Sequence, residues 1–198
     1  MTGTSNMLGR REVTATLLAD RGDTLVISGL GGAIWDVAAA GDVAENFYLW
    51  GAMGGAAPIG LGLALAQPER RVVVIAGDGE MLMGLGGLAT VAVQRPTNLA
   101  IAILDNERYG ETGMQPTHTS EGVDLAAVAA AAGFAETALV TDQEGLEAAV
   151  PLLREAPGPV MVVIKVGTEP LGIVMPPRDG AYLKDRFRAA LLGPGAAT

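Results

Sequence analysis

Two polar residues that could bind a metal ion each follow an apolar run of the sequence. Asp78 lies between Gly77 and Gly79 directly after one run, and Asn106 closes the next. Carboxylate and amide oxygens are hard ligands of the kind that Mg²⁺ takes, with ligand phosphates and water completing its shell. The glycines would let the backbone approach a phosphate, and a helix beginning near Glu80 would direct free N–H groups at it. The pair therefore predicts a site for Mg²⁺ and a diphosphate.

Both motifs also have a plain structural interpretation, because Gly, Asp and Asn dominate tight turns and helix caps. Neither of the two standard nucleotide-binding fingerprints is present in the sequence. No GxxxxGK[ST] loop occurs, since neither Lys165 nor Lys184 follows such a loop. The nearest approach to GxGxxG is the stretch 29–34, which lacks the final small residue. A P-loop is excluded and a dinucleotide fingerprint is disfavoured.

The elements that must position these residues can be read from the apolar pattern. Runs of strand length at 24–29, 46–50, 71–77, 98–105 and 159–166 alternate with helical stretches at 54–67, 80–95, 124–133 and 142–156. This alternation predicts an α/β fold, a parallel sheet with helices on both faces. Asp78 and Asn106 are one strand–helix–strand step apart, so their strands can be neighbours that end at the same edge. We expect one domain over residues 1–198, with a C-terminal helical extension at about 178–198, and a solvent-facing Asp78.

Composition narrows the function classes. Apolar residues form 49% of the chain, yet no run reaches the ~18 residues of a membrane span, so we expect a soluble, cytoplasmic protein that binds no membrane. The sequence contains no cysteine, which excludes thiolate metal sites and cysteine nucleophiles. A net charge of −9 with scattered Lys and Arg disfavours nucleic-acid binding. An anionic ligand would therefore need backbone donors or a metal.

The stretch "GDGEMLMG…LDNERYG", within residues 77–110, resembles the GDG…N signature of the thiamine-diphosphate-dependent enzymes. The similarity lies in the domain that binds the cofactor's diphosphate, and it extends from about residue 20 to 170. It implies the thiamine-diphosphate-binding fold. It also implies that Mg²⁺ is bound by Asp78, Asn106 and the main-chain carbonyl of Arg108.

Further positions follow from the same resemblance. The segment 50–66 is similar to one in which a glycine carbonyl, here Gly51, accepts from the cofactor's 4′-amino group. Met53 would be the bulky apolar residue that forces the cofactor into its bent shape. The loop 27–36 resembles one that touches the diphosphate. The other residues implied at the cofactor are Gly31, Gly32, Gly77, Gly79, Glu80, Tyr109 and Gly110.

The stretch 109–119 is most similar to the β subunits of sulfopyruvate decarboxylase and the matching domain of phosphonopyruvate decarboxylase. The resemblance implies a lyase, the diphosphate-binding subunit of a two-chain 2-oxo acid decarboxylase. A pyrimidine-binding α-type subunit would supply the proton-relaying glutamate, in a hetero-oligomer built on a dimer of this chain. This chain has Ile34 and Trp35 where those proteins carry a polar run, which leaves a less polar 2-oxo acid open.

Several assignments stay open. His118, the only histidine, is a candidate catalytic acid, base or donor because histidine titrates near neutral pH, but it could equally be a loop residue. Glu111 is an alternative source of the relaying glutamate. The alternative functions are a subunit of an acetolactate-synthase-like carboligase, a subunit of a 2-oxoacid oxidoreductase, and a non-enzymatic cofactor-binding subunit.

Overall fold

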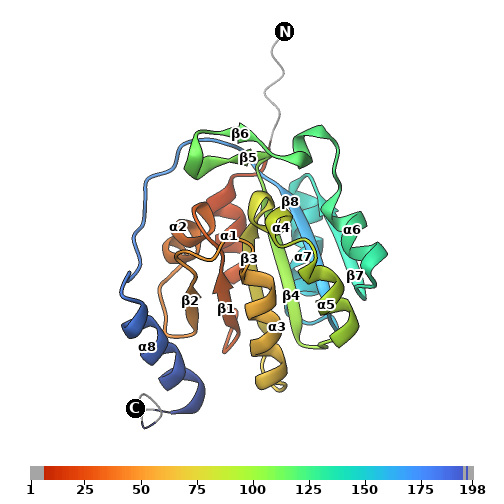
Figure 1. Ribbon diagram of the computed structural model, residues 1–198. Coiled ribbons are helices and arrows are strands. Elements are labelled where there is room, and N and C mark those ends of the chain that lie inside the picture. The colour runs from red at the N-terminus through yellow and green to blue at the C-terminus, as the bar shows by residue number, and fades with distance from the viewer. Residues whose placement is uncertain (1–6, 194, 196–198) are drawn as a thin grey trace.

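A six-stranded sheet forms the centre of the protein, as the computed structural model shows for residues 7–193 and 195. Its strand order is β2-β1-β3-β4-β8-β7, and every pairing is parallel (Figure 1). The strands are β1 Leu25–Ser28, β2 Asn46–Tyr48, β3 Val72–Gly77, β4 Leu99–Asp105, β7 Glu136–Val140 and β8 Val160–Lys165. Two short strands, β5 Arg108–Tyr109 and β6 Gln115–Pro116, form an antiparallel hairpin that follows β4.

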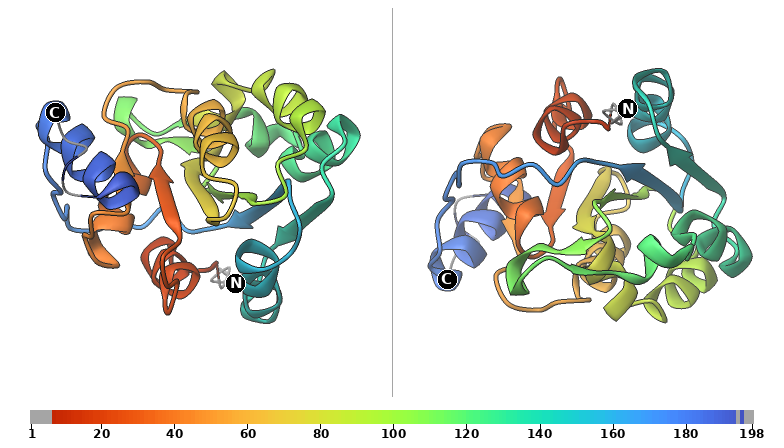
Figure 2. Two further views of the ribbon diagram at one scale, coloured as in Figure 1. Left: turned by 90° about the horizontal axis from the view of Figure 1, so that it is seen from below. Right: turned by 90° about the horizontal axis from the view of Figure 1, so that it is seen from above.

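Helices cover both faces of the sheet. They are α1 Arg10–Leu18, α2 Gly32–Ala39, α3 Ala56–Ala66, α4 Asp78–Met83, α5 Gly87–Gln94, α6 Leu125–Ala132, α7 Gln143–Arg154 and α8 Gly180–Leu192. Helices α1, α2 and α7 pack on one face, and α3, α5 and α6 pack on the other (Figure 2). Helix α8 lies at the β2 edge. Among the described residues, no helix has the length and apolar character needed to cross a bilayer.

The strands are buried on both sides, which explains their nearly continuous apolar sequences. In β3, Val73 and Ile75 face the layer of α1, α2 and α7, whereas Val72 and Val74 face the opposite layer. Full burial of a side chain of this size stabilises a fold by about 1.5–3 kcal/mol, before the entropy of ordering is counted. The sheet is therefore a firm platform for the loops at the carboxyl ends of its strands.

The predicted fold class is confirmed, and each of the five apolar runs contains a strand. The single helix expected over 80–95 is wrong: α4 and α5 are separate. The break between the two helices begins at Gly84. An added Cβ on Gly84 would stand 2.4 Å from the carbonyl oxygen of Gly54, so the backbones of these two glycines are in close contact there. Helix α8 lies in the expected C-terminal extension; residues 194 and 196–198 of that segment are outside the described residues.

Candidate functional site

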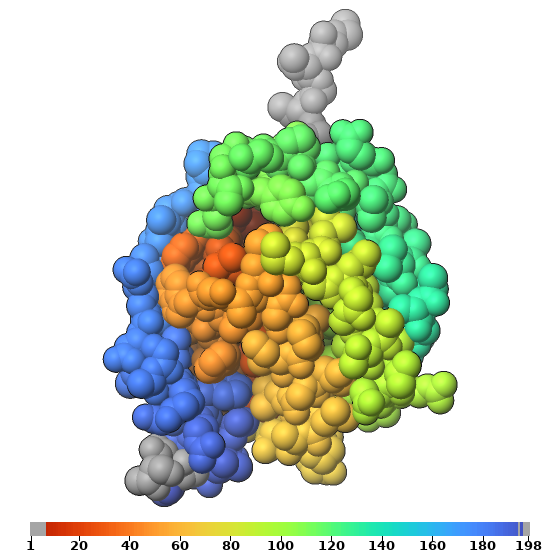
Figure 3. Space-filling model, viewed as in Figure 1, coloured from red at the N-terminus to blue at the C-terminus, as the bar shows by residue number. Residues whose placement is uncertain are grey.

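Asp78 and Asn106 leave the sheet at the same edge. Strands β3 and β4 pair in parallel with Gly77 opposite Leu104, and each polar residue directly follows the last residue of its strand. Both line a cavity of about 140 Å³. Figure 3 shows a hollow beneath the green segment that carries the β5–β6 hairpin, with the red N-terminal segment visible inside it.

Most of the residues expected at the cofactor line this one cavity. Those that do are Gly31, Gly32, Met53, Gly77, Asp78, Gly79, Glu80, Asn106, Arg108, Tyr109 and Gly110. Gly51 and His118 are exposed and do not line it. His118 begins the short helix η2 (His118–Glu121), so its catalytic role stays a prediction.

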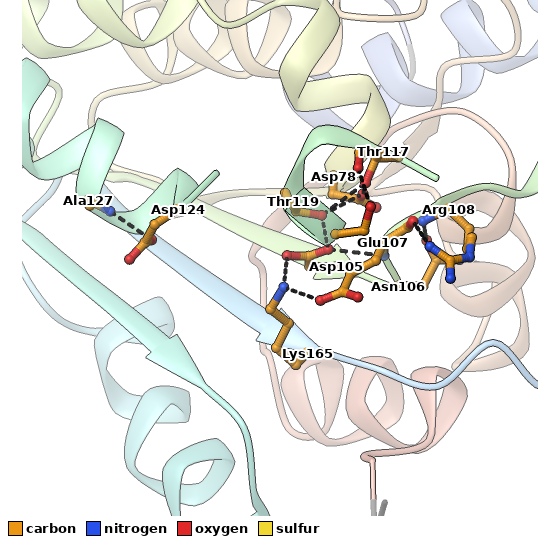
Figure 4. A network of polar contacts seen from close by, with 11 residues as sticks. Asp78, Asp105, Asn106, Glu107, Arg108, Thr117, Thr119, Asp124, Ala127 and Lys165 are labelled. Atoms are coloured by element: carbon orange, nitrogen blue, oxygen red, sulfur yellow. Dashed lines mark hydrogen bonds and ion pairs between the residues drawn. The ribbon is translucent and has the colours of Figure 1, made fainter. Parts of the chain in front are cut away.

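The Asp78 side chain is buried, with only 1% of its surface exposed, so the expectation of a solvent-facing carboxylate is wrong. Thr117 Oγ1 donates to Asp78 Oδ2 at 2.5 Å (Figure 4). Thr119 Oγ1 donates to Asp105 Oδ1 at 2.8 Å and lies 3.2 Å from Asp78 Oδ2. Burial raises the pKa of Asp78 to about 6, although the threonine hydrogen bonds act in the opposite direction.

A second group of contacts shapes the turn that carries Asn106. Lys165 at the end of β8 lies 2.8 Å from a carboxylate oxygen of both Asp105 and Glu107. The amide of Arg108 donates to Asn106 Oδ1 at 3.0 Å, and that of Glu107 donates to Asp105 Oδ1 at 3.1 Å. Burial acts to lower the pKa of Lys165, but the hydrogen bonds and charges of the two carboxylates together outweigh it and raise the pKa above its usual value. The turn at residues 105–108 is therefore held both by the ion pairs with Lys165 and by the hydrogen bonds that its own side chains accept from its backbone.

The donor set at this edge fits a hard divalent cation. Asp78 is a buried carboxylate whose charged form is disfavoured by burial, and a bound cation would offset that penalty. Its Oδ1 accepts no side-chain hydrogen bond from the described residues, and Asn106 Oδ1 keeps a second lone pair. No group of three or more His, Cys, Asp or Glu in the described part of the chain could hold a metal ion. Amide, carbonyl, phosphate and water oxygens would have to complete the shell, as Mg²⁺ commonly requires.

Glu80 connects two loops of the cavity. Its Oε2 accepts from the Leu30 amide at 2.8 Å, and its Oε1 accepts from the Ala56 amide at 3.4 Å. Burial raises the pKa of Glu80 to about 6, against the lowering effect of these backbone donors. An added Cβ on Gly29 would stand 1.9 Å from Glu80 Oε2, so the first glycine of the loop makes room for this carboxylate. Glu80 thus ties the loop before α2 to the start of α3.

Sequence reasoning missed three residues of this region. Thr117 and Thr119 bind the buried carboxylates from the N-cap and the first turn of η2, and no local pattern in the sequence indicated this. Arg10 lines the cavity from the first residue of α1, and nothing near it in the sequence indicated this. Trp35 and Trp50 contact each other edge to face at 5.5 Å between ring centroids and do not line the cavity.

Residues 34–164 match the family described as thiamine pyrophosphate enzyme, C-terminal TPP binding domain. The chain belongs to this family.

Relatives of this thiamine pyrophosphate enzyme domain include decarboxylases. The chain is 48% identical over 128 residues to the sulfopyruvate decarboxylase subunit beta of Methanothermobacter thermautotrophicus, covering 65% of this chain and 68% of the relative. It is 40% identical over 177 residues to the phosphonopyruvate decarboxylase of Streptomyces viridochromogenes, covering 89% of this chain but only 44% of the relative. The structure of benzoylformate decarboxylase from Polynucleobacter necessarius superposes with a TM-score of 0.67 at 20% identity, covering 83% of this chain and 34% of that one. This last likeness concerns the fold alone.

Proposed function

We propose that this chain is the diphosphate- and Mg²⁺-binding subunit of a two-chain, thiamine-diphosphate-dependent 2-oxo acid decarboxylase. The observation that carries the proposal is the meeting of Asp78, Asn106 and Met53 around one cavity at the carboxyl edge of the sheet. The decarboxylase names of the relatives support the reaction class, and the name "subunit beta" supports a second chain.

Each residue has a defined task in this proposal. When bound, thiamine diphosphate supplies an electron sink for breaking the bond between a carbonyl carbon and a carboxylate. Asp78, Asn106 and the main-chain carbonyl of Arg108 would hold the Mg²⁺ that neutralises the diphosphate. Met53 would support the bent cofactor, and the β5–β6 hairpin would shield the cavity from water.

The proton-relaying glutamate would come from a pyrimidine-binding α-type partner. Of the glutamates that line the cavity, Glu80 is already bound by backbone amides. Glu111 is exposed on the 3-10 turn of the hairpin. The site of a 2-oxo acid substrate would then lie between the two chains, and the full chain alone should release no CO₂. Thiamine-dependent turnover by the chain alone would contradict the shared site.

We also propose that the assembly is built on a dimer of this chain. Helix α3 is apolar nearly all round and leaves Ile59 and Leu65 exposed, with 37% and 52% of their surfaces accessible. Exposed apolar surface of this kind is typical of an interface. Light scattering at micromolar concentration should detect self-association, and a sharply monomeric species would contradict it.

The decisive experiment is a calorimetric titration of thiamine diphosphate, with and without Mg²⁺, into wild type, Asp78→Ala and Asn106→Ala. Both variants should bind the cofactor more weakly and lose much of the Mg²⁺ dependence, and the double variant should be non-additive because both residues act through one ion. If the isolated chain binds the cofactor too weakly for calorimetry, the titration is made with the complex of this chain and its partner. Equal metal-dependent affinity in wild type and Asp78→Ala would refute the proposal. Product analysis separates decarboxylation from carboligation, which shares the same cofactor site.

A further inference from the structure

Arg10 brings a positive charge into the cavity from a distant element. It is the first residue of α1, and its guanidinium Nε donates to Oδ2 of Asp36 on α2. The Asp36 side chain has no exposed surface, whereas the Arg10 side chain is 18% exposed. The guanidinium group is planar and its N–H groups have fixed directions. A buried carboxylate that accepts from one of them therefore also sets the direction of the others. Asp36 therefore orients Arg10.

Asp36 does not neutralise the positive charge around it, because two arginines share its single negative charge. Arg11 Nε lies 3.2 Å from Asp36 Oδ1, and Arg11 Nη2 donates to the carbonyl of Gly172 at 2.8 Å. Arg11 thus directs its terminal nitrogen toward the C-terminal segment and does not line the cavity. One positive charge of the cluster remains for a ligand.

The terminal nitrogens of Arg10 lie at the start of α2. An added Cβ on Gly32 would stand 2.6 Å from Arg10 Nη1, so only a glycine allows the guanidinium to approach the backbone there. Within the part of the chain that the structure describes, neither Nη of Arg10 donates to a protein acceptor. Helix α2 has no side-chain cap at Gly31, so its first N–H groups point at the same space.

The other charges of the cavity make an unpaired cation there useful. Asp78, Glu80 and Glu111 also line it, and an anionic ligand would be repelled unless cations offset them. Arg108 lines it as well, but its Nη1 donates to the carbonyl of Glu107 at 2.8 Å. Glu111 lies near Gly31, where an added Cβ would stand 2.9 Å from Glu111 Cγ, but it forms no ion pair with Arg10. A guanidinium beside uncapped helix N–H groups is a combination that binds anionic oxygens strongly.

We infer that Arg10 is an anion-binding residue of this cavity, oriented by Asp36, whose terminal N–H groups bind anionic oxygens at the start of α2. The inference rests on the proposed function. The place beside Gly31 and Gly32 favours the cofactor's diphosphate as the anion. A carboxylate of the 2-oxo acid has the same chemistry, and the test separates the two.

The test compares Arg10→Met with Arg11→Met, since each removes one partner of Asp36 and only the first removes a charge from the cavity. The full chain, or its complex with the partner, is titrated calorimetrically with Mg²⁺–thiamine diphosphate and with Mg²⁺–pyrophosphate. Arg10→Met should weaken both affinities by about tenfold or more, as expected for loss of a charge-assisted hydrogen bond, and Arg11→Met should leave them within about twofold. Arg10→Lys, which keeps the charge without the planar fork, should lie between.

The results for Arg10→Met distinguish the two possible anions. Unchanged probe affinities with a raised KM for the 2-oxo acid in Arg10→Met would assign the substrate carboxylate as the anion. Equal affinities and equal KM values in Arg10→Met, Arg10→Lys and wild type would overturn the inference, while the Asp78-dependent binding would leave the proposed function standing. Failure of wild type to bind either probe would overturn the proposed function and, with it, the inference. Melting curves check that the paired Met variants are folded to the same degree.

Discussion

Thr117 donates a hydrogen bond to Asp78, with 2.5 Å between Thr117 Oγ1 and Asp78 Oδ2. The bond joins the segment after the hairpin to the turn at the end of β3. Because the protein uses Oδ2, the other carboxylate oxygen is the one available to a cation. The folded chain therefore holds a buried negative charge in place before any ligand binds, at a cost to its own stability.

The first prediction concerns the pH dependence of that cost. The pKa of Asp78 is raised from 3.8 to about 6 in the folded state. Between about pH 4 and pH 6 the folded chain therefore keeps a proton that the unfolded chain has lost, so the free energy of unfolding should fall as pH rises through this window. The fall amounts to roughly 3 kcal/mol at most. Mg²⁺-dependent cofactor affinity should change in the opposite direction, weakening below about pH 6 as Asp78 takes up its proton.

The variant Asp78→Asn separates the contribution of Asp78 to the pH dependence of stability from that of Glu80, whose pKa is also about 6. At about pH 7.5 the ligand-free variant should be more stable than wild type by urea denaturation, yet unable to bind the cofactor through Mg²⁺. Thr117→Val removes a donor to the charged form and should raise the pH midpoint of cofactor affinity. A destabilised Asp78→Asn with normal cofactor affinity would favour a turn or cap residue instead, whose loss costs about 0.5–2 kcal/mol.

The second prediction concerns Met53. Met53→Ala should keep the metal and diphosphate contacts but lower turnover of the assembled complex by about 10- to 100-fold, because the reacting groups would no longer be held in register. Met83→Ala is the matched control, since Met83 is 66% exposed and does not line the cavity. Turnover that is equal in the two variants would remove Met53 from the site.

Much of the fold could be predicted from local sequence. The central strands are buried on both faces, so they appear as short apolar runs, and the polar residues that follow two of these runs, Asp78 and Asn106, mark the ligand edge. Strand β7 was missed because it is an edge strand whose residues 136–140 are mostly exposed or half-buried. Helix α1 was missed because its sequence mixes charged residues with two threonines, which are weak helix formers.

The details of the site depend on contacts that no local pattern encodes. The meeting of Asp78 and Asn106 was predictable, because a single right-handed crossover separates their strands. Arg10 reaches the cavity only through α1 and the buried Asp36, and Glu80 is identified as a link between loops only by the two amides that it binds. Burial of Asp78 depends on a segment that lies beyond the hairpin.

The third prediction tests Glu80 as that link. Glu80→Ala should leave the Leu30 and Ala56 amides without their acceptor, which lowers the free energy of unfolding by about 1–3 kcal/mol relative to Glu80→Gln. The glutamine keeps an acceptor for one of the two amides and removes the buried charge, so its stability should lie between those of wild type and Glu80→Ala at neutral pH. Urea denaturation measures the difference. Equal stability of the two variants would show that the loops hold together without this side chain.

The fourth prediction concerns the second glycine of the Gly77-Asp78-Gly79 turn. An added Cβ on Gly79 would stand 2.5 Å from Cε1 and 2.6 Å from Cδ1 of Tyr109, so the ring, which lines the cavity from β5, would have to move. Gly79→Ala should therefore destabilise the chain by about 1–3 kcal/mol, as overpacking does, and weaken cofactor binding.

Gly77→Ala is the control for this prediction, because an added Cβ there meets no atom within 4 Å and φ is −86°. Its effect on stability should stay within about 0.5 kcal/mol. If the tyrosine ring is the obstacle, Tyr109→Ala should remove most of the cost of Gly79→Ala, which gives a coupling energy of about 1–3 kcal/mol in a double-mutant cycle. Additive effects, or a Gly79→Ala no worse than Gly77→Ala, would mean that the glycine is needed for a reason other than the close approach of Tyr109.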